Sequence, residues 1–384
     1  MRRAAAQALR LRAWALGVLT GAPAAAPPHA GADAWELFLA VERCAHPLRR
    51  ALSSAGVMEA LADPARAALE RHGIPEAMKS LALRLEAAAV AGMLAERGWT
   101  GIVLKGGAAV LDGACEVGMF DLDLLVRPEH ARPLVEAMDR AGYRKEWDDV
   151  DPDTPGKHEM AVRIREGGIM VEIHFDLAPR LEGDLFAGAV PLPVAPLLRL
   201  APAENLWHVL IHGTLHHPDR RGVLRDVMVA TAGVRWCSPA ELAEVERRCA
   251  AHPRGHVPAR MLAMARDFAA GRAADPFARD AAAGYLLRLH TRAHEPSEAR
   301  WLALSRTVFA LVEGRGEMGT LWYGEPESAI FRGYVGDSAL DRRLPLAAAV
   351  IRSAWRSANL VAAFPAARWI ARASAELAAD PPAF

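Results

Sequence analysis

The chain lacks most of the features that mark secreted and membrane-spanning proteins. Its four cysteines lie far apart in 384 residues, and no two form a Cys-x-x-Cys pair. This spacing argues against a disulfide framework or a cysteine zinc cluster, and a reducing compartment is the simpler assumption. No run of about 18 uncharged apolar residues occurs, so we expect no membrane span.

An excess of charge of either sign is also absent. Lys+Arg and Asp+Glu each number 46, so the formal net charge is zero. A protein that binds long nucleic acids would show a basic excess or a basic stripe, and we therefore expect no such partner. The length instead predicts two or three packed units of an ordinary globular protein.

The first residues imitate a secretory signal only loosely. Arg2 and Arg3 precede an apolar stretch at 14–20, but Arg10 and Arg12 lie against that stretch and a glycine interrupts it. A signal peptide has a longer apolar segment without such charges. We therefore expect a first helix in a cytoplasmic protein.

Hydrophobic periodicity divides the chain into three regions. Residues 33–97 have apolar side chains at helical spacing, and Gly98 follows where a helix C-cap glycine would lie. After an α/β segment the pattern is again helical, apart from a polar segment at Gly314–Gly336. The predicted plan is a helical N-terminal region at 1–97, an α/β core at 98–190, a proline-rich linker at Pro191–Pro202 and a helical C-terminal region at 203–384.

The α/β segment opens with a strand, a turn and a helix. Gly101–Leu104 is a short apolar run suited to a buried strand, and Lys105–Gly107 is expected to end it in a glycine-rich turn. A helix is expected from Ala108, and Phe120–Val126 is predicted to be the second strand.

Two acids share one face of that second strand. Because alternate side chains of a strand share a face, Asp121 and Asp123 point the same way. Neighbouring carboxylates repel each other, and a divalent cation is the obvious compensation, since Mg²⁺ prefers carboxylates together with phosphate oxygens and water. The alternative is a solvated face of an edge strand, which would need no ion.

A predicted hairpin offers a third acid. His158–Arg165 and Ile169–Phe175 alternate around a Gly-Gly pair, and Glu172 lies within the second, largely apolar run. A buried carboxylate is costly unless it is paired or metal-bound, so three carboxylates would converge if this strand lay beside Phe120–Val126. His174 shares the face of Glu172, either as a ligand-orienting group or base or as a satisfied core histidine.

These motifs together resemble a known family. A strand with a Gly-rich turn, an Asp-x-Asp strand and a later acidic strand resemble the nucleotidyltransferase fold of the DNA polymerase beta-like superfamily. More closely, they resemble the uncharacterised bacterial nucleotidyltransferase family proteins. The match is carried by 104–106, 121–126, 171–174 and a later region with spaced histidines and an aspartate, Asn205–His217 and Asp226.

The resemblance implies an α+β fold, in which a nucleotidyltransferase-fold mixed sheet core is flanked by helical N- and C-terminal regions. It implies that Asp121, Asp123 and Glu172 are catalytic and hold Mg²⁺, with Mn²⁺ as an alternative ion. An NMP group would pass from an NTP to a small-molecule or peptide/protein acceptor, and pyrophosphate would leave.

The resemblance also implies that Lys105, Gly106 and Gly107 bind the nucleotide, because glycine lets backbone N–H groups approach phosphates closely. The family has an arginine shortly before the Asp-x-Asp strand, and Glu116–Met119 supplies none. The rival interpretation is therefore a catalytically degenerate protein of the same fold that binds a nucleotide or a partner.

Three histidines recur every four residues. His208, His212 and His216 would form one stripe on a helix, which could bind Zn²⁺ or substrate or could simply be the polar face of that helix. We favour the polar face over a zinc hydrolase because no HExxH motif or cysteine pair lies nearby. His174, His212 and Asp226 are expected to support the main site from behind the metal ligands.

Overall fold

The computed structural model describes residues 1–22, 26–147, 149–150, 159–177, 183–217, 220–294, 298–313 and 345–379. At residues 298–300, 302 and 345–361 it describes the backbone alone. The polar segment expected at Gly314–Gly336 lies outside these residues.

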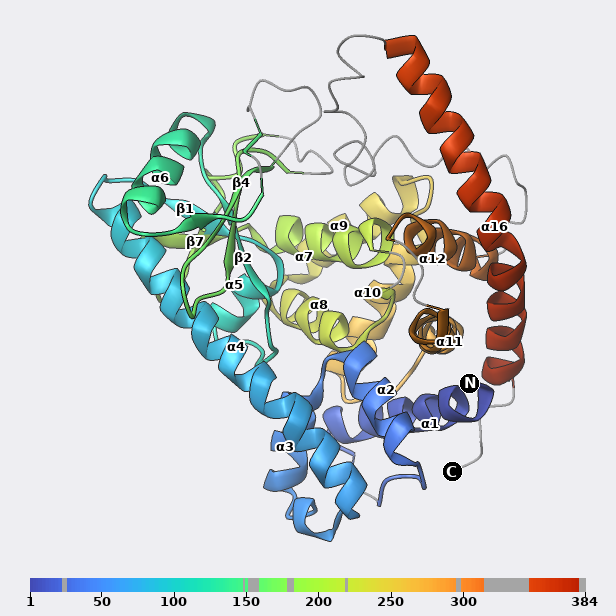
Figure 1. Cartoon of the computed structure of the whole chain (residues 1–384). Coiled ribbons are helices and arrows are strands. Elements are labelled where there is room, and N and C mark those ends of the chain that lie inside the picture. The colour runs from blue at the N-terminus through green and yellow to red at the C-terminus, as the bar shows by residue number, and fades with distance from the viewer. Residues whose placement is uncertain are drawn as a thin grey trace.

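The described residues form an α+β fold, as the sequence predicted: a mixed sheet with helices before and after it along the chain (Figure 1). Gly98 follows the last N-terminal helix with φ +65°, so the predicted C-cap is confirmed. The N-terminal helices are α1 (Arg2–Leu19), α2 (Ala32–Glu42), α3 (Ala45–Ser54), the short η1 (Met58–Ala60) and α4 (Asp63–Ala95).

Seven strands in the described part of the chain make one sheet, in the order β3-β4-β5-β2-β1-β7-β6. Helices α5 (Lys105–Leu111) and α6 (Pro128–Arg140) lie between strands along the chain. The strands are β1 (Gly101–Val103), β2 (Asp121–Leu125), β3 (Arg144–Lys145), β4 (Glu159–Ile164), β5 (Met170–His174), β6 (Val190–Pro191) and β7 (Leu197–Arg199).

The register of the central strands decides which side chains meet. β4 and β5 pair antiparallel, which confirms the predicted hairpin, and β5 runs parallel to β2 with Asp123 opposite Glu172. Leu122 and Leu124 of β2 point to the other face, where Leu124 and Leu94 of α4 both lie against Gly101. One face of β2 is therefore core, and the acidic face is turned away from α4.

The structure corrects the expectation of a linker at Pro191–Pro202. This segment instead contributes β6 and β7, and β7 pairs parallel with β1. Leu197 and Leu200 are buried, and Pro191 lies in the edge strand, where a missing N–H is tolerated. Proline content marked this stretch as a linker because the burial of its leucines was not visible from composition.

The glycine-rich turn also differs from the prediction. Helix α5 begins at Lys105 and not at Ala108, so both glycines lie in its first turn. Lys105 has φ +53°, a left-handed conformation that costs a non-glycine residue about 1–3 kcal/mol. Such conformations cluster at functional sites, and here the turn directs the lysine toward β2.

The C-terminal helices complete the fold. The predicted histidine helix is interrupted, because α7 passes into a π-helical turn, η2, at His212. Among the described residues, none of the helices combines the length with the apolar character that a membrane span requires. The elements are α7 (Pro202–Ile211), η2 (His212–His216), α8 (Leu224–Trp236), α9 (Pro239–Ala251), α10 (His256–Ala269), α11 (Ala278–His294), α12 (Glu298–Val312) and α16 (Pro345–Ala379).

Candidate active site

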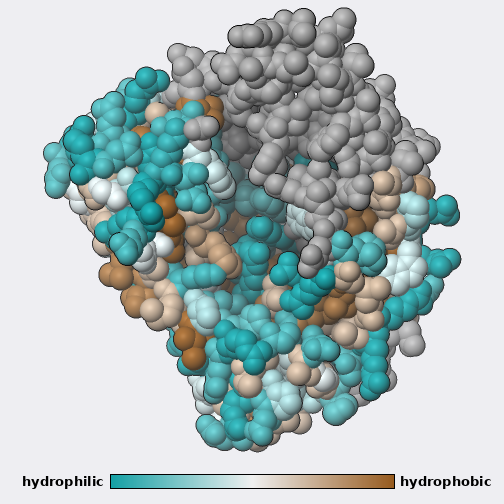
Figure 2. Space-filling model, in the orientation of Figure 1, coloured by the Kyte–Doolittle hydropathy of each residue, from teal (hydrophilic) through white to brown (hydrophobic). Residues whose placement is uncertain are grey.

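A cleft of about 490 Å³ separates the acidic face of the sheet from helices α7 and α8. On the face shown in Figure 2, a hollow with hydrophilic residues inside it lies over this part of the fold. Asp121, Asp123 and Glu172 line one wall of the cleft. The parallel pairing of β2 with β5 places Asp123 opposite Glu172, and Asp121 lies two residues before Asp123 on the same face of β2.

Lys105 and His174 partly neutralise the negative charge of the carboxylates. The Lys105 Nζ donates to Asp123 Oδ1 at 2.6 Å. The His174 Nε2 lies 3.1 Å from the same oxygen and 3.7 Å from Glu172 Oε2. Both Asp123 and His174 are buried, so these contacts are weakly screened by solvent.

The pKa values show that the compensation is unequal. Burial would raise the pKa of Asp123, but the charge of Lys105 and the hydrogen bond to His174 hold it well below its usual range. Burial and the neighbouring Asp123 raise the pKa of Asp121, and burial, with the charges of both aspartates, raises that of Glu172. Burial would lower the pKa of His174, but its hydrogen bonds to the acids raise it to about 9. Negative charge is thus in excess on this wall.

These residues could hold a cation. Ligand atoms of Asp123, Glu172 and His174 lie within 4.8 Å of one another. Asp121 is on the same face of β2, two residues before Asp123, and lines the same cleft. Carboxylate oxygens suit Mg²⁺ and Mn²⁺, so the chemistry of the donor set fits the expected ion.

The opposite wall is made of histidines, which we call the histidine wall: His208, His212, His216 and His217. The His212 ring centroid lies 6.1 Å from that of His208, 5.9 Å from that of His216 and 4.6 Å from that of His217. Asp226 lines the cleft beside them. The expected stripe of His208, His212 and His216 therefore lines the same cleft as the carboxylates, although the π-turn carries two of its three histidines.

Of the three residues expected to bind the nucleotide, the structure places two in the lining of the cleft and one outside it. Lys105 and Gly106 line the cleft, whereas a Cβ at Gly107 would lie 3.0 Å from Val103 on the inner side of α5. A Cβ at Gly106 would lie 2.6 Å from the Met119 Sδ, so glycine there also permits close packing of this turn.

Three arginines that sequence reasoning did not select line the same cleft: Arg43, Arg220 and Arg225. Arg225 binds Asp226 at 2.7 Å and is 8% exposed. The charges of Arg220 and Arg225 act on Asp121, whose pKa they lower against the effect of burial. They come from distant segments and follow no motif, so proximity in the fold was needed to find them.

Glu159 and two aromatic residues were also missed. Burial and the charge of Glu172 raise the pKa of Glu159 to about 7. Phe120 and Trp147 line the cleft and are 38% and 55% exposed, and the Phe120 ring lies under the Lys79 ammonium. The only sequence signal for Glu159 was an acid at the start of a strand otherwise rich in apolar residues.

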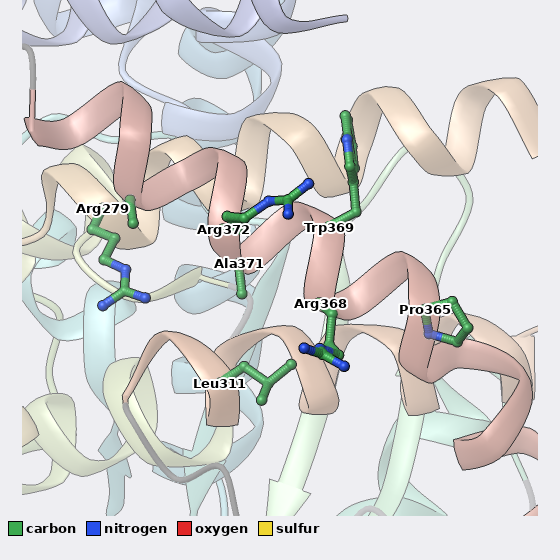
Figure 3. Close-up of a pocket in the computed structure, with 8 residues that line it drawn as sticks. Arg279, Leu311, Pro365, Arg368, Trp369, Ala371 and Arg372 are labelled. Atoms are coloured by element: carbon green, nitrogen blue, oxygen red, sulfur yellow. The ribbon is translucent and has the colours of Figure 1, made fainter.

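A second cavity, of about 470 Å³, lies between α11, α12 and α16. Figure 3 shows Arg368 and Arg372 projecting from α16, with Leu311 of α12 below this helix. Arg279 of α11 lies at the left of the view. The described residues that line it include no acid, so it lacks the donors of a magnesium site. The cleft beside β2 is therefore the candidate active site.

Comparison with known proteins identifies a family for the region that contains the cleft. A model of a family described as "Uncharacterised nucleotidyltransferase" matches residues 33–269, which is more than half of the chain and includes both walls of the cleft. No curated protein and no solved structure matches significantly.

Proposed function

The chain belongs to the uncharacterised nucleotidyltransferase family, and from this premise we propose that it is an Mg²⁺-dependent enzyme that moves an NMP group from an NTP to a small-molecule or peptide/protein acceptor. The observation that carries the proposal is the pairing of Asp123 with Glu172 across β2 and β5, with Asp121 on the same face. Mn²⁺ is the alternative ion, because His174 lies beside the same oxygens.

Asp121, Asp123 and Glu172 would hold the ion. When bound, Mg²⁺ supplies positive charge that stabilises the attacking and leaving oxygens of an in-line displacement. His174 contacts both Asp123 and Glu172, so it orients the two carboxylates toward each other. Asp226 holds Arg225, and His212 belongs to the opposite wall, so these two residues support the site from the helical side.

The cations of the cleft would hold the triphosphate. Arg43, Arg220 and Arg225 supply the guanidinium groups that the segment before β2 lacks, and Lys105 adds an ammonium group beside Asp123. This supply of positive charge favours catalysis over the degenerate, non-catalytic alternative.

The reaction is a substitution at the α-phosphorus. The acceptor oxygen forms a bond to phosphorus, and the bond from phosphorus to the α–β bridging oxygen breaks. Pyrophosphate leaves with the electron pair, and the acceptor proton passes to a base in the cleft or to water. Positioning and charge stabilisation supply most of the rate in such transfers.

The neutral overall charge supports an acceptor other than a long nucleic acid. Cytoplasmic location stays part of the proposal, because four unpaired cysteines fit a reducing compartment.

The test is transfer of label from α-³²P-labelled ATP, CTP, GTP and UTP with Mg²⁺ or Mn²⁺, to the protein itself and to acceptors in a cell extract. Label that depends on Asp123 is the expected result. Nucleotide binding by calorimetry without label would favour the non-catalytic protein. Absence of both label and binding would contradict the proposal.

A further inference from the structure

The histidine wall has a role that the carboxylates do not explain. His208 belongs to α7, His212 and His216 belong to the π-turn η2, and His217 follows directly. All four side chains line the cleft. Ligand atoms of Asp123, Glu172 and His174 lie within 4.8 Å of one another, and none of the four histidines of the wall belongs to this group. The wall therefore faces the metal-binding residues from the other side of the cleft.

His208 carries an unmet hydrogen-bonding capacity. Its side chain is 3% exposed, and neither ring nitrogen has a hydrogen-bond partner among the described residues. A buried polar group without a partner costs about 1–3 kcal/mol. The π-turn η2 is a rare conformation that is frequently found at functional sites. Both observations are explained if a ligand supplies the missing hydrogen bonds.

The charge state of the wall limits the chemistry of that ligand. Burial, together with the charge of Lys105, holds the pKa values of His208 and His212 well below the usual range. Burial and the charge of Arg220 lower the pKa of His217 to about 2. At neutral pH these rings are uncharged, and each offers one N–H donor and one nitrogen acceptor.

A hydroxyl group complements such a surface, because it both donates and accepts hydrogen bonds. An anionic group would accept but not donate hydrogen bonds, so it would leave the acceptor nitrogens of the rings without a partner. An ammonium group would donate but not accept, and it would share the cleft with Lys105, Arg220 and Arg225. The uncharged hydroxyl avoids both conflicts.

We infer that the histidine wall is the acceptor subsite and that it binds a hydroxyl group of an uncharged small molecule, presented across the cleft from Asp123. The inference rests on the proposed nucleotidyl transfer and specifies its acceptor. The triphosphate would then contact Lys105 and the arginines, and His208 would orient the hydroxyl group by hydrogen bonding.

The first experiment uses the wild-type protein. A small-molecule extract of the producing organism is separated by ion exchange into uncharged, anionic and cationic fractions, and each is offered with α-³²P-NTP and Mg²⁺. We expect at least tenfold more labelled product from the uncharged fraction, and loss of that product after the fraction is acetylated. Label from a charged fraction, or from none of the three, would overturn the inference.

The second experiment compares His208→Leu with His208→Gln, whose amide keeps a donor and an acceptor. The leucine variant should lose about tenfold in kcat/KM for the uncharged fraction, as expected for a hydrogen bond of about 1.4 kcal/mol, and glutamine should restore part of it. The affinity for a non-hydrolysable NTP analogue should change less than twofold in both. His294→Leu, an exposed site on α11, is the control.

Failure of the inference can be told from failure of the proposed function. Wild-type protein that neither binds NTP nor shows Asp123-dependent labelling contradicts the function itself. Normal labelling by His208→Leu, or a parallel loss of nucleotide affinity, contradicts only the acceptor subsite. Thermal melting of each variant identifies a loss that is due to unfolding.

Discussion

Two buried charge clusters lie close together in this fold and differ in how well their charges are balanced. In the first, Arg12 binds Glu42 at 2.6 Å, Asp275 at 2.8 Å and the Gly222 carbonyl at 2.7 Å. Glu42 also accepts hydrogen bonds from the Tyr285 hydroxyl and the Leu224 amide. Nearly every donor and acceptor has a partner, which is the arrangement of a structural cluster.

In the second cluster, Lys105 and His174 contact the acids Asp121, Asp123, Glu172 and Glu159 at Asp123, and the charges of Arg220 and Arg225 act on Asp121. The acids line a cavity, and the pKa values of all but Asp123 are raised. The balanced charges around Arg12 are thus typical of a cluster that stabilises the fold. The unbalanced charges at the cavity wall are typical of a site that binds a ligand.

The two clusters are also connected through the backbone. Glu42 precedes Arg43 at the end of α2, and Leu224 precedes Arg225 at the start of α8. Both arginines line the cleft. The balanced cluster therefore fixes the positions from which cations reach the unbalanced one.

The largest expected effect is a loss of activity, and it should follow from a substitution in the second cluster but not in the first. Asp123→Asn should lower nucleotidyl transfer by roughly 10³-fold or more, because it removes a metal ligand and charge stabilisation at the reacting centre. Label transfer and thermal melting are the measurements, with the exposed Asp33→Asn as control. Folded Asp123→Asn protein with normal transfer would refute the assignment of the site.

Arg12→Met should affect stability. It leaves Glu42 and Asp275 buried without their cation, so the free energy of unfolding should fall by about 3–5 kcal/mol. Urea denaturation measures the loss, and Mn²⁺ titration of the folded protein should give unchanged affinity. A variant of wild-type stability would show that this cluster is not structural.

The pH dependence of the free energy of unfolding should reveal the raised pKa of Glu159. Its pKa is raised from about 4.3 in the unfolded chain to about 7 in the fold, so the folded state binds more protons between these values. Stability from this group is therefore lost as the pH rises through that window. Glu159→Gln should remove the loss and stabilise the protein at pH 8 by up to about 3 kcal/mol.

Urea denaturation at pH 5 and pH 8 gives the difference, and the exposed Glu146→Gln is the matched control. If both variants follow the wild-type profile, the carboxylate of Glu159 is solvated and does not belong to the unbalanced cluster.

The smallest effect concerns Lys105. Lys105→Met removes a positive charge 2.6 Å from Asp123, so Mn²⁺ should bind about tenfold more tightly, while transfer falls because phosphate loses a cation. Isothermal titration and label transfer measure the two opposite changes, with Lys145→Met as control. A parallel loss of metal binding and transfer would mean that Lys105 holds the carboxylates in place.

Sequence patterns predicted those parts of the fold that depend on local physics. Helical periodicity found α4 and its Gly98 cap, and alternation around Gly167-Gly168 found the β4–β5 hairpin. The same alternation placed Asp121 and Asp123 on one face, because the period of a strand is fixed by its backbone. These inferences needed no knowledge of distant contacts.

Other features depended on long-range packing. Pro191–Pro202 was mistaken for a linker because only its pairing with β1 makes β7 a strand. Left-handed Lys105 moved the start of α5, and the motif gave no sign of that conformation. The division of the chain into three regions stays a prediction.

By itself, then, the sequence determined the acidic strand, the hairpin acid and the histidine spacing, because each arises within a few residues of the backbone. Only the tertiary structure decided that Glu172 pairs with Asp123, and that the histidines and Arg43, Arg220 and Arg225 line the same cleft as these acids. Strand register and helix packing set those distances, and both depend on the burial of apolar faces that come from distant parts of the chain.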